Sequence, residues 1–168
     1  MTVDVFALNF LYSLLATILG GVILALLFFW TRERFFPLPK IDGRWYFEVK
    51  TVSSAYNPYK GMILHYIAMV WRQDNCITGT FEKIYEKSST GERHFDGVNR
   101  TRGIINGFIE KKYFSKDRIV LHIVEDGHGR ESTHFYDLKV KSSHELEGKF
   151  ESMVANQTGD VRCQRGEL

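Results

Sequence analysis

The stretch from Val5 to Trp30 runs for 26 residues without a charged side chain. A bilayer has a hydrocarbon core about 30 Å thick, which a helix of about 20 apolar residues crosses. Aromatic rings, whose amphipathic character suits the headgroup region, gather near both ends of the stretch. They are Phe6, Phe10, Tyr12, Phe28, Phe29 and Trp30. We therefore expect residues 1–34 to form an N-terminal transmembrane helix with its flank.

The charges around this stretch predict that the helix is retained and how it is oriented. The residues before it include Asp4 but no Lys or Arg, whereas a cleavable signal has a basic leader and a shorter apolar run. Arg32, Arg34 and Lys40 follow it directly. Since cytoplasmic flanks carry an excess of Lys and Arg, we expect a single-pass protein whose C-terminal domain is cytoplasmic.

Small and weakly polar residues recur at every fourth position of the expected helix, at Asn9, Ser13, Thr17, Gly21 and Ala25. This spacing places them on one helix face, where small side chains let another backbone approach closely and hydroxyl groups bond across helices. We expect Ser13, Thr17, Gly21 and Ala25 to pack against other copies of the chain. The alternative is that they reflect the general abundance of small residues in membrane helices.

The chain changes character after a short linker at residues 35–40, which contains Pro37 and Pro39. From there, apolar and polar residues alternate with period two, as in half-buried strands. We expect strands near 43–53, 61–73, 76–87, 92–98, 102–114, 117–126, 131–141, 144–154 and 159–165. Residues 41–168 are thus predicted to form one all-β domain.

The connections between these runs are short, which predicts antiparallel neighbours in an up-and-down meander of about eight strands. Closing such a sheet into a barrel removes its exposed edges. The phrase apolar-x-Gly-x-bulky occurs at Gly43, Gly79, Gly107 and Gly148, and glycines in strands are typical of sharp bends and close backbone approach. We predict a small antiparallel β-barrel; an open sheet or sandwich with stray glycines is the alternative.

Charge and motifs exclude several classes of function. Residues 31–168 carry 22 basic and 19 acidic residues, a net charge of +3 without a basic stripe, which argues against binding a DNA or RNA polymer. No nucleophile elbow, zincin motif, phosphate-binding Gly-rich loop or Cys-x-x-Cys pair occurs. We expect no enzymatic activity, no catalytic residue, no metal site and no cofactor. We place Glu82, Glu86, Glu110 and Glu125 on a solvated outer face.

Three polar clusters could orient a small ligand in a barrel of this size. They contribute the candidate residues Tyr56, Tyr59 and Lys60, then Arg100 and Arg102, then Arg130, Thr133 and His134. Arg forks suit phosphates, and Tyr rings stack on bases. Together they fit a small anionic ligand that contains bases. The alternative is that these are ordinary turn residues and that the barrel interior is filled by its own side chains.

An N-terminal membrane helix followed by a compact barrel that begins Ile41-Asp42-Gly43-Arg44-Trp45 resembles the transmembrane β-barrel effectors of bacterial CBASS antiphage defence. These are CD-NTase-associated proteins. The resemblance spans the whole chain and also involves the segments Gly97–Gly107 and Gly129–Leu138. Members commonly have two membrane helices, whereas this chain has one clear apolar run.

The resemblance implies a nucleotide-binding barrel that senses a cyclic dinucleotide made by a partner CD-NTase cyclase after infection. Binding would drive homo-oligomerisation, and the clustered helices would disrupt the bacterial inner membrane in abortive infection. The lipid bilayer would then be both the location and the target of the protein.

Two other functions remain open from the sequence. Gly43-Arg44-Trp45 matches the G-x-W of lipocalins, with Arg162 or Arg165 as a stacking partner for the tryptophan. That match would imply a membrane-tethered carrier of a small apolar ligand. The third alternative is a ligand-free scaffold that binds another protein.

Overall fold

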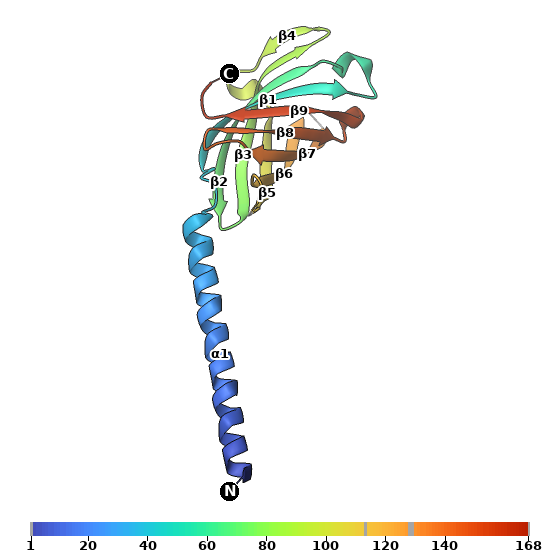
Figure 1. Cartoon of the computed structure of the whole chain (residues 1–168). Coiled ribbons are helices and arrows are strands. Elements are labelled where there is room, and N and C mark those ends of the chain that lie inside the picture. The colour runs from blue at the N-terminus through green and yellow to red at the C-terminus, as the bar shows by residue number, and fades with distance from the viewer. Residues whose placement is uncertain (1, 113, 128–129, 168) are drawn as a thin grey trace. The chain divides into compact units, whose positions relative to one another are not determined.

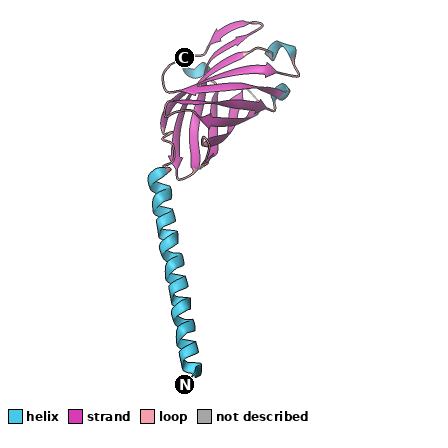
Figure 2. Ribbon diagram, viewed as in Figure 1, coloured by secondary structure: helices cyan, strands magenta, loops and turns pink. Residues whose placement is uncertain are grey.

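The computed structural model describes residues 2–112, 114–127 and 130–167, except for the side chains of residues 2–4, 33 and 130. The chain forms a long helix and a barrel of strands (Figures 1 and 2). They are two separate compact units, Met1–Leu38 and Pro39–Leu168. The division falls inside the linker predicted at residues 35–40.

Helix α1 (Thr2–Phe35) is continuous through the whole apolar stretch. Its segment Val5–Arg32 is long and apolar enough to cross a membrane by length and composition. The Thr17 hydroxyl donates to the Ser13 carbonyl oxygen at 2.8 Å, so its donor is satisfied within the helix itself. Pro37 follows the helix end, where a residue without an N–H cannot continue the hydrogen-bond ladder.

The barrel unit has nine strands among the described residues. They are β1 (Gly43–Ser53), β2 (Ile63–Gln73), β3 (Cys76–Ser88), β4 (Gly91–His94), β5 (Arg102–Glu110), β6 (Arg118–Gly127), β7 (Arg130–Val140), β8 (Glu145–Ser152) and β9 (Gln157–Gln164). Three short 3₁₀ turns lie in the connections: η1 (Asn57–Tyr59), η2 (Gly97–Asn99) and η3 (Val154–Asn156).

The strands pair antiparallel in the order β2-β1-β9-β8-β7-β6-β5-β3-β4, and β2 also pairs with β3. This additional pairing closes eight strands into a barrel and leaves β4 as a short extension of the β3 end (Figure 1). The predicted all-β antiparallel barrel of about eight strands is therefore confirmed. The strand expected near 92–98 is only the four-residue β4, which does not belong to the closed wall.

Alternation along the strands points a set of large side chains into the barrel. The largest fully buried residues include Trp45, Phe47, Tyr66, Phe81 and Tyr136. The Tyr66 and Phe81 rings stack with centroids 4.0 Å apart, and Phe47 meets Phe81 edge-on at 6.0 Å. Such ring pairs add stability beyond the area that they bury, so an aromatic cluster forms the centre of the core.

Three of the four repeated glycines, Gly79, Gly107 and Gly148, mark places where neighbouring strands approach closely. A Cβ atom on Gly148 would lie 1.9 Å from the Asp137 carbonyl oxygen, and one on Gly107 would lie 2.2 Å from that of Val120. No side chain fits at those distances, so glycine is required by the close approach of backbone to backbone. The predicted role of this motif in a tightly coiled barrel agrees with these contacts.

One end of the barrel is closed by a tryptophan and an arginine. The Arg165 guanidinium lies over the Trp45 ring, 4.1 Å from its centroid. The Arg165 nitrogens donate to the carbonyl oxygens of Asp42 at 2.7 Å, Lys40 at 3.1 Å and Arg44 at 3.2 Å. Of the two arginines that the sequence suggested as stacking partners, Arg165 is the one that stacks.

Candidate functional site: a polar cavity at the mouth of the barrel

The barrel interior is hollow at the end opposite Trp45. A cavity of about 380 Å³ lies there, within the size range of small-molecule sites. Its lining comes from most strands of the closed wall and from the loops above them. The lining residues are Val49, Tyr59, Met62, Leu64, Tyr66, Lys83, Glu86, Arg93, Phe95, Thr101, Glu125, Gly127, Ser132, His134, Tyr136, Phe150, Val154 and Gln157. The interior is thus filled at one end and open at the other.

The floor of the cavity holds a buried carboxylate with three polar neighbours. The Glu125 side chain is 7% exposed. Its oxygens lie 3.4 Å from the Tyr66 hydroxyl, 3.4 Å from His134 Nε2 and 3.5 Å from Lys83 Nζ. Ser132 Oγ lies 3.2 Å from the same His134 nitrogen. Buried charges persist only when they are paired, so these residues form one connected polar cluster.

The positions of Glu125 and Glu86, which both line the cavity, correct the sequence prediction that they lie on a solvated outer face. Every second residue of β6 points into the barrel, namely Ile119, Leu121 and Ile123. Glu125 is the next residue in this alternation and therefore also points inward. Strand residues i and i+2 share a face, so this signal was present in the sequence. A charged residue at the end of an apolar face marks the change from packed core to polar cavity.

Burial and charge act in opposite directions on the pKa of Glu125. Burial raises this pKa, while the hydrogen bonds and positive charges of His134 and Lys83 lower it and prevail, so the carboxyl is more acidic than usual. Burial also raises the pKa of Tyr66 and Tyr136 well above the ordinary tyrosine value, and the nearby Glu125 charge adds to this. At neutral pH the cluster therefore holds an ionised carboxylate beside neutral phenols.

Polar groups without a partner line the upper part of the cavity. The Arg93 side chain makes no hydrogen bond or ion pair with any described residue, whereas its backbone lies in β4, which pairs with β3 opposite Glu86. Neither the Thr101 hydroxyl nor the Tyr59 hydroxyl donates to another described group, although both residues line the cavity. These groups can bond a ligand without first giving up an internal contact.

Two of the residues predicted to bind ligand lie at this cavity: Tyr59 and His134. Tyr56 packs edge-on against Tyr59, with ring centroids 5.0 Å apart, but is 53% exposed and does not line the cavity. Lys60 is exposed in the same loop. Thr133 alternates with the inward His134 and lies on the outer side of β7.

The predicted arginines are not brought together at the cavity. Arg100 Nη1 and Arg102 Nε both bind the Glu82 carboxylate, at 3.1 and 3.3 Å. The Arg102 side chain is 76% exposed. Arg130 begins β7, but its side chain lies outside the described part of the structure. Lys83 and Arg93 take the place in the cavity that the sequence interpretation gave to these arginines.

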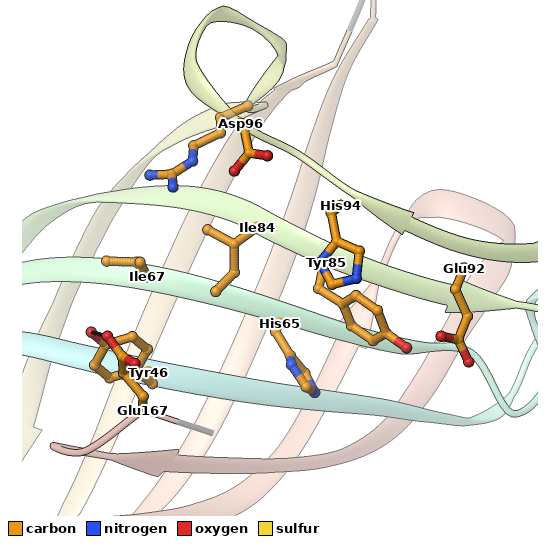
Figure 3. A pocket seen from close by; sticks show the side chains of 10 residues that line it. Tyr46, His65, Ile67, Ile84, Tyr85, Glu92, His94, Asp96 and Glu167 are labelled. Carbon is orange, nitrogen blue, oxygen red and sulfur yellow. Dashed lines mark hydrogen bonds between the residues drawn. The ribbon is translucent and has the colours of Figure 1, made fainter.

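A second hollow, of about 630 Å³, lies on the outer wall over β1 to β4 (Figure 3). The rings of His65, Tyr85 and His94 form a row there, with neighbouring centroids 4.9 Å apart. The Glu167 carboxylate accepts a hydrogen bond from the Tyr46 hydroxyl at 3.2 Å. Across the described residues, no group of three or more His, Cys, Asp or Glu side chains could hold a metal ion here or elsewhere.

Comparison with known proteins identifies the fold alone. No model of a known protein family and no curated protein matches the sequence. The structure is similar to that of a redesigned β-barrel, with a TM-score of 0.51 and 11% sequence identity. The match covers 76% of this chain and 92% of that barrel. It supports the closed barrel architecture and carries no information about ligand or activity.

Proposed function

We propose that this protein is a membrane-anchored sensor whose barrel binds a cyclic dinucleotide in the cavity at its mouth. Binding drives self-association of the chain and disruption of the bacterial inner membrane, as part of antiphage defence. The observation that supports this proposal is the cavity at the open end of the closed barrel. Its walls combine unpaired polar groups with aromatic rings. The resemblance to CBASS effectors supplies the nature of the ligand and of the response.

The lining matches the parts of such a ligand. Arg93 presents a free guanidinium, which suits the bidentate recognition of a phosphate. Tyr59 offers a ring on which a base can stack. The ionised Glu125 can accept hydrogen bonds from base N–H groups. Phosphate, base face and base edge therefore each have a candidate partner around one cavity.

The membrane half of the proposal rests on α1. The basic residues Arg32 and Arg34 lie in its last turn, which favours a cytoplasmic barrel by the positive-inside rule. The face with Ser13, Thr17, Gly21 and Ala25 would pack between copies, since small residues permit close helix contact. A soluble nucleotide made in the cytoplasm would then reach the cavity directly.

The test is calorimetry on the full-length protein in lipid nanodiscs, titrated with a panel of cyclic dinucleotides. We expect saturable binding that Arg93→Ala weakens about 10- to 100-fold, the range for losing a charge-assisted hydrogen bond. Arg102→Ala is the matched control, because Arg102 is exposed and pairs with Glu82 on the outer wall. Loss of binding in Arg102→Ala but not in Arg93→Ala would move the site away from the cavity.

The contact between Trp45 and Arg165 favours a second candidate, a lipocalin-like carrier of a small apolar ligand. The cavity argues against it, because Lys83, Glu86 and Glu125 would be desolvated against an apolar molecule at considerable cost. Displacement of a fluorescent fatty acid separates the two functions. A carrier binds the fatty acid and ignores nucleotides, whereas a ligand-free scaffold binds neither.

A further inference from the structure

The outer face of five neighbouring strands carries a broad region without charge. Strand register places three rows of residues side by side on this face: two of them span β2, β3, β5, β6 and β7, and the third spans β2, β3, β5 and β6 and ends at Val120, which is 7% exposed. The first row is Met69, Thr80, Ile104, Val124 and Thr133; the second is Trp71, Thr78, Asn106, His122 and Phe135; the third is Gln73, Cys76, Phe108 and Val120. We call these three rows the neutral wall. None of its residues is Asp, Glu, Lys or Arg.

Large apolar side chains in the neutral wall are left open to solvent. Ile104 is 60% exposed, Trp71 50%, Phe108 49%, Met69 44% and Phe135 41%. Single exposed apolar residues are ordinary on protein surfaces, but contiguous apolar patches mark interaction sites. Aromatic residues and Met are also enriched in protein interfaces. The neutral wall therefore has the composition of an interface core.

Charged residues surround the neutral wall. The next row towards the mouth contains Glu82, Arg102, Asp126 and Glu131 in register. Arg44 on β1 lies opposite Met69, and Glu151 on β8 lies opposite Phe135. At the other end, Asp137 lies beside Val120, and Glu110 pairs with Arg118. An apolar centre within a polar rim is the usual anatomy of a protein–protein interface.

The charges of this rim argue against a lipid surface as the partner. An anionic membrane attracts clusters of Lys and Arg. The rim instead mixes both signs, with Glu82, Asp126, Glu131 and Glu151 against Arg44 and Arg102. Acids and bases in one rim can pair with each other across two copies of the same surface. Because the centre of the wall carries no charge, two copies of it can meet without placing like charges against each other.

We propose that the neutral wall is the surface through which two copies of this chain associate. The apolar helix places copies in one bilayer in one orientation, which raises their effective concentration. Copies that share one orientation in a bilayer can be related by a two-fold axis along the membrane normal, which is the symmetry that an isologous contact requires. Isologous contact of this kind is the commonest form of homo-oligomer. The inference deepens the proposed function, because it names the contact surface of the assembly.

Site-specific cross-linking in the full-length protein tests the proximity of two walls. A Cys76→Ser background removes the exposed thiol and leaves the buried Cys163. Asn106→Cys then places one thiol in the middle row, on the central strand of the wall, and Thr158→Cys places one on β9 as the control. In nanodiscs holding two or more copies, we expect a short bis-maleimide to link Asn106→Cys and to leave Thr158→Cys monomeric.

A charge introduced into the wall tests its contribution. We expect Ile104→Glu to lower the cross-linked fraction about tenfold, because it places a carboxylate in an apolar contact. Val52→Glu is the matched control, since Val52 is 52% exposed on β1, outside the wall. Circular dichroism of each variant confirms that the barrel is folded.

The outcomes separate this inference from the proposed function. Equal cross-linking of the two thiols, or insensitivity to Ile104→Glu, would overturn the inference, as would a monomer both with and without cyclic dinucleotide. Protection of Asn106→Cys from maleimide without cross-linking would assign the wall to lipid or another protein, and would also overturn it. Calorimetry on the same samples reports nucleotide binding independently, so either proposal can fail while the other stands.

Discussion

Replacing Arg165 by Ala would remove the group that closes the packed end of the barrel. Its guanidinium covers the Trp45 ring and donates to the carbonyl oxygens of Lys40, Asp42 and Arg44. These carbonyls lie just before β1 and at its start, so the Arg165 side chain, which directly follows β9, ties the beginning of the barrel to its end. We expect the substitution to lower the free energy of unfolding of the barrel.

The magnitude follows from the contacts. A cation over an aromatic ring contributes about 0.5–1 kcal/mol where it is partly exposed. Each intramolecular hydrogen bond adds about 1 kcal/mol net, and Arg165 makes three to the backbone. The sum is about 3–4 kcal/mol, or a fall in Tm of about 10 °C for a domain of this size. Arg165→Lys should recover little of this, because an ammonium cannot donate in a planar fork.

Thermal unfolding in a mild detergent measures the effect, followed by the circular dichroism of the strands and the fluorescence of the buried Trp45. Arg162→Ala is the matched control, because Arg162 lies on β9, three residues before Arg165, which directly follows that strand. Arg162 Nε contacts Glu145 Oε1 at 3.2 Å, with the Arg162 side chain 59% and the Glu145 side chain 38% exposed, and such surface pairs contribute little. We expect Arg162→Ala to shift Tm by no more than about 2 °C.

A similar loss in both variants would refute this reasoning, because it would mean that the stacked geometry contributes no more than a surface ion pair. A large loss that Arg165→Lys fully restores would also refute it, since charge alone would then account for the stability.

Two further predictions concern the buried Glu125 cluster in the cavity and the close approach of strands at Gly148. Lys83→Met should make acid unfolding begin at higher pH. In the folded protein the pKa of Glu125 is lowered, so its ionised carboxylate stabilises the fold at pH values above the ordinary carboxyl pKa, and this stabilisation is lost as the pH falls through the folded-state pKa. Lys83 is one cause of the lowered pKa, so its removal should bring that loss to a higher pH. Coincident acid-unfolding curves, followed by near-UV circular dichroism, would contradict this. Gly148→Ala should cost about 3 kcal/mol or more, because the new Cβ meets the Asp137 backbone, whereas Gly166→Ala has open space and should be nearly neutral in the same thermal assay.

Much of the fold follows from local pattern. The uncharged run from Val5 to Trp30 predicts a helix long and apolar enough to cross a membrane, and period-two alternation places most strands within a few residues of their observed bounds. Short connections leave antiparallel pairing as the simple topology. The expected strand near 92–98 is the exception, because whether a short run joins the wall or extends a hairpin depends on pairing that no local pattern specifies.

Less of the candidate site could be predicted from the sequence. Arg100 and Arg102 looked suited to a ligand because they are framed by glycines, yet both pair with Glu82. The residues that meet in the cavity, such as Lys83 and Glu125, come from strands distant in the chain. The alternation of inward and outward residues along β6 predicts that Glu125 points into the barrel. No local sequence pattern identifies Lys83 and His134 as its partners.

The sequence by itself determined which segments are helix and strand and which face of most strands is buried, because periodicity and hydrophobicity act over a few residues. Only the tertiary structure decided that β2 pairs with β3 to close the wall, that Arg165 rather than Arg162 covers Trp45, and that the barrel is hollow at one end. Those features depend on strand register and stagger around the whole barrel, which bring together residues far apart in the chain.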